Sequence, residues 1–107
     1  MENFTERINI IKESILKFIP AKYIYLFGSY AYGAPTEKSD IDIYIVAPDD
    51  TKNFSELYGK IIVDLGDRKI FFIDLLLCRE SVFNKRKNEN ILEKTICQKG
   101  KMIYHEY

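Results

Sequence analysis

Hydrophobic residues recur along this chain with two periods, and these predict alternating helices and strands. Apolar residues at three- and four-residue spacing over 5–19 and 53–65 predict two amphipathic helices. Shorter apolar or alternating runs at 23–27, 40–46 and 70–77 predict three strands, with a short helix after the first of them. In the tail we expect a helical turn at 81–87, a helix ending at Lys99 and a short strand at 102–104. This order predicts an α/β (α+β) fold with a small mixed sheet flanked by helices.

Local signals add detail to these elements. Thr5 is the expected N-cap of the first helix, and Gly66 is expected to follow the end of the helix at 53–65. The run at 70–77 is apolar except for Asp74, which predicts a central strand that is covered on both faces.

Several side chains are assigned to the core by their neighbours in sequence. Ile91, Leu92, Thr95 and Ile96 are expected to face inward from the last helix, and Tyr58 is expected to complete the core. Cys78 and Cys97 lie in apolar surroundings without metal-ligand spacing, which predicts buried free thiols in a reducing cytoplasm.

Composition restricts the class of protein. The 107 residues, 47% of them hydrophobic, predict one domain over 1–107 with a real core. Sixteen basic and sixteen acidic residues cancel, which argues against direct binding of a polynucleotide backbone. No apolar run approaches the roughly 20 residues that span a membrane, and no signal-peptide pattern is present at the N-terminus.

The strand predicted at 40–46 carries a pair of carboxylates. Asp40 and Asp42 alternate with isoleucines, so both point to one face of the strand, roughly 6.6 Å apart along it. Two divalent cations with carboxylate ligands would offset the repulsion between such charges. The alternative is that two solvated aspartates begin a strand.

Two further places in the sequence carry groups that could bind a ligand or take part in catalysis. Gly28 and Ser29 follow a strand and open a short helix, so their N–H groups and the hydroxyl could cradle a phosphate; the alternative is an ordinary strand-ending turn. Asp74 is a lone carboxylate in an apolar strand, and a buried charge must be paired, hydrated or metal-bound. It either pairs with a nearby Lys or Arg, lies at a strand end open to water, or joins the other two aspartates.

The combination of Gly28-Ser29, ten intervening residues and Asp40-x-Asp42, with a strand on each side, resembles the signature of the DNA polymerase β-type nucleotidyltransferase superfamily. The short chain resembles its minimal nucleotidyltransferase (MNT) branch, known as antitoxins of HEPN–MNT toxin–antitoxin pairs. The resemblance implies the polymerase β-like nucleotidyltransferase fold, ATP as substrate and two Mg²⁺ ions. It also implies catalytic and metal-binding roles for Asp40, Asp42 and Asp74, and nucleotide binding by Gly28 and Ser29.

The resemblance further implies a reaction and a partner. Relatives of this branch transfer AMP from ATP to a tyrosine of a HEPN ribonuclease toxin, with which they form hetero-oligomers. This chain has Tyr32 where many relatives have Arg, which either weakens nucleotide binding or shifts that role to Lys38 or another basic residue. Tyr30 and Tyr32 flank the proposed cradle and are expected at the partner interface. The alternative function is a non-catalytic binding module that masks its partner.

Overall fold

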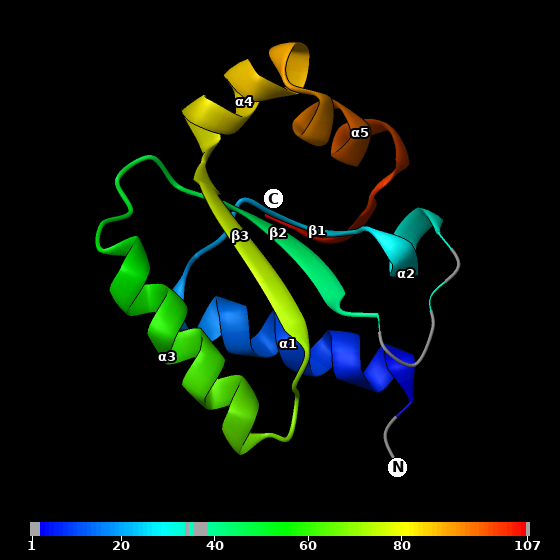
Figure 1. The fold of residues 1–107 in the computed structure, drawn as a ribbon. Coiled ribbons are helices and arrows are strands. Elements are labelled where there is room, and N and C mark those ends of the chain that lie inside the picture. The colour runs from blue at the N-terminus through cyan, green and yellow to red at the C-terminus, as the bar shows by residue number, and fades with distance from the viewer. Residues whose placement is uncertain (1–2, 34, 36–38, 107) are drawn as a thin grey trace.

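The protein is described by a computed structural model that covers residues 3–33, 35 and 39–106. Helices and strands alternate as the hydrophobic pattern predicts, and the α/β fold with a small mixed sheet is confirmed (Figure 1). Their bounds, in chain order, are α1 (Phe4–Phe18), β1 (Tyr23–Phe27), α2 (Ser29–Tyr32), β2 (Ile41–Ala47), α3 (Phe54–Asp67), β3 (Ile73–Arg79), α4 (Glu80–Glu89), α5 (Ile91–Lys99) and β4 (Lys101–His105).

The four strands lie in the order β3-β2-β1-β4. β1 pairs antiparallel with β2 and β4, whereas β2 and β3 run parallel. The predicted central position of the run 70–77 is therefore wrong, because β3 is an edge strand and begins only at Ile73. β2 takes a central place instead, and all its residues except Asp42 are buried.

Helices cover both faces of the sheet. α1 and α3 lie on one face and α4 and α5 on the other (Figure 1). Alternation along β2 serves both layers: Ile43 packs with Ile15 and Leu65 in the core on the α1–α3 side. Tyr44 packs with Phe83 in a second core beneath α4 and α5. Asp42 has the parity of Tyr44, so it belongs to the α4–α5 face.

The first two long helices deviate from the predicted ends. α1 is capped by Asn3 rather than Thr5: the Asn3 side-chain oxygen accepts a hydrogen bond from the Glu6 N–H at 2.8 Å. α3 continues past Gly66, and Arg68 is its C-cap. In both cases the observed cap lies two positions from the residue that the sequence favours.

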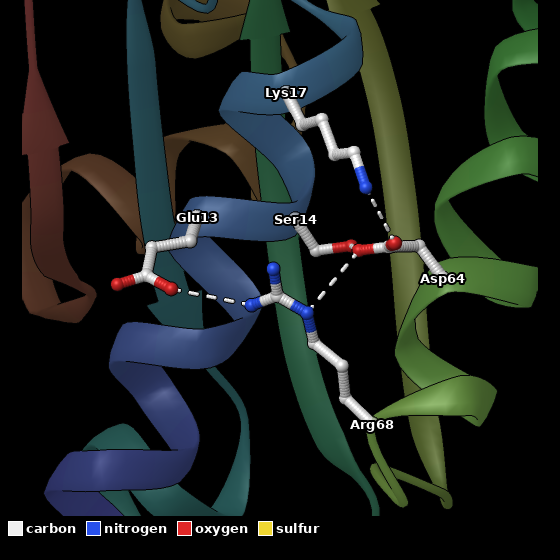
Figure 2. Close-up of polar contacts among 5 residues, drawn as sticks. All are labelled: Glu13, Ser14, Lys17, Asp64 and Arg68. Carbon is white, nitrogen blue, oxygen red and sulfur yellow. Dashed lines mark hydrogen bonds and ion pairs between the residues drawn. The ribbon is translucent and has the colours of Figure 1, made fainter.

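A polar cluster joins α1 to α3 (Figure 2). The buried Ser14 hydroxyl donates to Asp64 Oδ2 at 2.6 Å, and Lys17 Nζ lies 2.9 Å from Asp64 Oδ1. Arg68 bridges the helices, with Nε 3.5 Å from Asp64 Oδ2 and Nη1 3.2 Å from Glu13 Oε2. The Asp64 carboxylate therefore holds the helical layer together on one side of the sheet.

The inward face of α5 differs from the prediction. Ile96 is buried as predicted, but Ile91 and Leu92 are exposed, Thr95 is only partly buried, and Glu93 is the second buried residue of the helix. The prediction followed the hydrophobicity of single residues. In the structure, α5 is oriented so that the Glu93 carboxylate lies in the core beside the Tyr44 hydroxyl.

Two of the other burial expectations are also wrong. Cys97 is exposed, although Cys78 is buried, and both thiols are free. Tyr58 is 39% exposed on α3. Among the described helices, none is both long and apolar enough to cross a membrane.

Candidate active site

Two of the predicted site aspartates meet at one end of the sheet. Asp42 is the second residue of β2 and lies in register with Phe27 of β1 on one side and with Asp74 of β3 on the other. Because β2 and β3 are parallel, residues in register share a face, so Asp42 and Asp74 are neighbours on the α4–α5 side. Asp40 immediately precedes β2. The fold thus gathers carboxylates that are separated by more than thirty positions in sequence.

Asp74 is exposed, which agrees with the alternative that places it at a strand end open to water. It is the second residue of an edge strand, so water reaches its carboxylate. Asp74 is a candidate site residue because it lies in register with Asp42, which is half-buried.

The electrostatics of Asp42 reflect this crowding. Burial raises the pKa of its carboxyl above the ordinary value of 3.8, and the negative charges of Asp74 and Asp40 raise the pKa further. Each carboxylate therefore makes ionisation of the central one more costly. A positive charge bound among them would relieve this repulsion, and this favours a cation at this end of the sheet.

Gly28 lies against the Asp42 carboxylate. Its backbone has φ 71° and ψ −154°, a conformation that side-chain-bearing residues rarely adopt. A Cβ built on Gly28 would overlap Asp42 Oδ2 and come within 2.9 Å of Asp42 Cγ. Glycine is therefore required here for two reasons, the backbone conformation and the close approach of a carboxylate.

The turn after Gly28 is short and internally bonded. Ser29 opens α2, and the Gly28 carbonyl accepts hydrogen bonds from the N–H groups of Ala31 at 3.0 Å and Tyr32 at 3.1 Å. Ser29 is half-buried. The predicted cradle residues Gly28 and Ser29 thus adjoin the aspartates, since Gly28 directly contacts Asp42.

The two tyrosines of α2 have different environments. Tyr30 stacks on Phe4 of α1, with ring centroids 4.9 Å apart and planes at 9°, so it anchors α2 to the domain. Its predicted place at the partner interface stays a prediction. Tyr32 is 42% exposed beside the site, and its interface role stays a prediction. Lys38, the predicted substitute for the missing arginine, lies outside the described residues.

A buried hydrogen bond between Tyr44 and Glu93 was not predicted from the sequence. The hydroxyl of Tyr44, two residues after Asp42, donates to Glu93 Oε2 at 2.9 Å, and Arg86 Nη1 lies 3.8 Å from the same oxygen. Burial raises the pKa of Tyr44, so the hydroxyl stays protonated. The spacing of Glu93 and Ile96 on one helical face was the available signal, but it identifies no partner for the carboxylate.

Carboxylate oxygens are typical ligands of divalent cations, but the described carboxylates are not arranged as a complete metal site. Among the residues that the structure describes, no three His, Cys, Asp or Glu side chains are arranged to hold a metal ion. What the geometry provides is a concentrated negative charge next to a glycine turn that leads into a helix.

The sequence of this chain is similar to sequences of nucleotidyltransferases and of proteins named as adenylyltransferases. A family model described as a nucleotidyltransferase domain matches residues 8–97. A Methanocaldococcus jannaschii protein with the provisional name of a protein adenylyltransferase is 36% identical over 83 residues, which cover 78% of each chain. The protein adenylyltransferase MntA of Shewanella oneidensis is 34% identical over 87 residues, covering 75% of this chain and 60% of MntA.

Solved structures agree with this assignment. A toxin–antitoxin complex crystallised with AMP-PNP matches with a TM-score of 0.66 and 27% identity, over 92% of this chain and 73% of that chain. A tri-AMPylated Shewanella oneidensis HEPN toxin in complex with MNT antitoxin matches with a TM-score of 0.62 over 95% of this chain and 72% of that chain; at 24% identity it shows the shared fold. The family match covers the glycine turn and all three aspartates, and this chain therefore belongs to the nucleotidyltransferase domain family.

Proposed function

We propose that this chain is a protein adenylyltransferase that transfers AMP from ATP to a tyrosine of a HEPN ribonuclease toxin and so neutralises it. The observation that carries the proposal is the position of Asp42, between the Gly28 turn and Asp74. The names of the relatives and the AMP-PNP complex of a similar structure support the reaction. We place the reaction in the cytoplasm, where free thiols such as those of Cys78 and Cys97 persist.

The glycine turn would hold the triphosphate. The Ser29 hydroxyl would donate a hydrogen bond to a phosphate oxygen, and the backbone N–H groups of Gly28 and Ser29 would bind further phosphate oxygens. Because Gly28 touches the Asp42 carboxylate, a triphosphate held by the turn lies close to the aspartates.

The aspartates fit Mg²⁺ by their chemistry. Carboxylate oxygens are preferred ligands of Mg²⁺, and burial, together with the negative charges of Asp74 and Asp40, raises the pKa of Asp42, so a bound cation would favour its ionised form. Asp40, Asp42 and Asp74 would hold the ions, which when bound neutralise phosphate charge and lower the pKa of an acceptor hydroxyl.

Asp74 would serve the acceptor. It is exposed at the open end of the sheet, where a hydroxyl of another protein can reach it. The acceptor oxygen attacks the α-phosphorus, the bond to the β-phosphate breaks and pyrophosphate leaves, while the hydroxyl proton passes to Asp74. Positioning by the turn and the strand pair supplies the geometry of the in-line attack.

The test is an AMP-transfer assay with a co-encoded HEPN ribonuclease. We expect a substoichiometric amount of this chain, with ATP and Mg²⁺, to silence the ribonuclease and to raise its intact mass by one or more AMP units. Asp74→Asn should remove both effects, whereas Asp50→Asn, at an exposed loop aspartate remote from the site, should leave them unchanged.

The competing function is masking by complex formation. It predicts that silencing needs at least equimolar protein, ignores ATP and survives Asp74→Asn. Stoichiometric, ATP-independent inhibition with no change in the mass of the partner would overturn the proposed transfer.

A further inference from the structure

An apolar groove runs along the outer side of β3. We call it the β3 groove, and six of its lining residues carry the argument: Tyr58, Ile62, Phe71, Phe72, Leu76 and Leu77. It consists of two hollows of about 340 and 360 Å³ that share Tyr58 as a common wall. Phe72 is 79% exposed and Phe71 54% exposed. Contiguous apolar surface rimmed by polar residues is typical of an interaction site.

The exposure of Phe72 is built into the backbone. Its φ is +60°, a left-handed conformation that is rare for a bulky side chain. The conformation is fixed on the sheet side, where the Phe72 carbonyl accepts a hydrogen bond from the Ile41 N–H at 3.0 Å. A strained residue that projects an aromatic ring into solvent is unfavourable for an isolated domain and favourable for one that binds a partner there.

β3 itself is an unprotected edge. In the described part of the chain it pairs only with β2, so one row of its backbone groups faces outward. Exposed edges are commonly blunted by lysine, proline or a bulge, yet between Asp74 and Arg79 this strand is Leu-Leu-Leu-Cys. Such an edge accepts an added strand or an apolar helix from another chain.

The groove leads directly to the candidate active site. Phe72 lies two residues before Asp74. Ile73 is in register with Ile41, which lies in sequence between Asp40 and Asp42. At the other end, the Arg79 guanidinium lies 4.4 Å from the centroid of the Phe54 ring. The groove thus follows the edge of β3 and passes the strand position of Asp74, whose sequence neighbours Ile73 and Leu75 line it.

The chemistry of the groove identifies its occupant. The six lining residues named above are all uncharged, so the groove does not suit a polynucleotide backbone. A small acceptor would not need a surface that follows a whole strand. A protein that presents a hydroxyl to Asp74 must contact the edge of the sheet around Asp74, and the residues on either side of it, Ile73 and Leu75, line the groove at that edge.

We infer that the β3 groove is the docking surface for the protein that receives AMP, and that Phe72 and Tyr58 are its main anchors. The inference rests on the proposed function, because the occupant is the HEPN partner of that reaction. Aromatic anchors in hollows dominate many interfaces. The groove would align the acceptor hydroxyl with Asp74, whereas ATP would be held on the other side of Asp42 by the glycine turn.

The test uses variants that keep the backbone. Phe72→Asn suits the left-handed conformation and removes the ring, and Tyr58→Ser removes the shared wall of the two hollows. For the double variant we expect the Kd for the co-encoded HEPN protein, measured without ATP, and the KM for that protein to rise about tenfold or more. The kcat at saturating partner and the KM for ATP should stay unchanged. The matched control is Ile91→Asn, at an apolar position on α5 that is 83% exposed, and it should alter none of these values.

The outcomes separate docking from chemistry. Wild-type partner affinity in the double variant would overturn the docking surface, even if AMP transfer proceeds. Loss of partner affinity would support the docking surface, even if no AMP is transferred, and in that case the proposed reaction alone fails. If size-exclusion chromatography shows that the variant alters only self-association, the groove is a contact between copies of this chain and the inference is overturned.

Discussion

At the scale of single residues, the candidate site depends on the space that Gly28 leaves for the Asp42 carboxylate. The contact joins the end of β1 to the start of β2, at the point where the two strands are in register. It also explains why a glycine, and not merely a small residue, begins the turn, because both the positive φ and the carboxylate exclude a Cβ.

Gly28→Ala should damage both stability and activity. The substitution places a Cβ in a backbone region reserved for glycine, so we expect a loss of about 1–3 kcal/mol in the free energy of unfolding. The displaced Asp42 carboxylate should lower AMP transfer by roughly 100-fold or more. Urea unfolding and the transfer assay measure the two effects.

The matched control is Gly59→Ala, in the exposed middle of α3, where a Cβ would meet no atom within 4 Å. It should stabilise the protein by about 0.5–1 kcal/mol, because alanine favours a helix interior. Equal behaviour of the two alanine variants would contradict the role assigned to Gly28.

At the scale of elements, α1 and α3 are joined by charge as well as by apolar packing. The hydrogen bond from Ser14, and next the one from Lys17, hold the pKa of Asp64 below its ordinary value of 3.8. The folded state therefore favours the ionised carboxylate. Its contribution to stability is present above the unfolded pKa and is lost as pH falls through the lowered pKa of the folded state.

Asp64→Asn should show this pH dependence directly. The variant keeps an oxygen for the Ser14 hydroxyl but loses the charge that faces Lys17 and Arg68 (Figure 2). We expect it to be less stable than the wild type at pH 7, and the difference to shrink as the pH falls below about 3.8. Thermal melts across this range measure it. Asp67→Asn, at an exposed position on the same helix, is the control, and a similar pH profile for both variants would contradict the interpretation.

The predicted strands and helices were confirmed as elements, but their places in the sheet were not predictable. The period of apolar residues reports that a segment is half or fully covered, not which neighbour covers it. Run 70–77 has the composition of a central strand, yet its first residues form the connection, and among the described residues β3 pairs with β2 alone. Likewise, α5 buries Glu93 because Tyr44 lies opposite it, and that partner is 49 residues away.

At the scale of the whole molecule, nucleotide binding should be coupled to folding. The site combines parts of β1, α2, β2 and β3, so an unfolded chain lacks it. A ligand that binds only the folded state stabilises it by about 2.7 kcal/mol at a concentration of 100 times its Kd.

ATP should therefore raise the melting temperature only when Mg²⁺ is present. The reason is that the three aspartates repel the triphosphate unless their charge is offset. Differential scanning fluorimetry with ATP and Mg²⁺, and again after addition of EDTA, measures the shift. The Asp40→Asn, Asp42→Asn double variant is the control and should show no shift with Mg²⁺. A shift with ATP that EDTA leaves intact would contradict the role of the metal.

The sequence by itself determined the local features of this protein. The alternation after Ser39, the break at Gly28 and the spacing from Gly28-Ser29 to Asp40 depend on residues near one another in the chain, and these identified the fold and the glycine–aspartate motif. Only the tertiary structure decided that Asp74 is exposed beside Asp42, that β3 has a free apolar edge, and that Gly28 contacts a carboxylate. The physical reason is that strand order and register arise from the packing of segments that are distant in sequence. A local pattern of apolar residues carries no information about that packing.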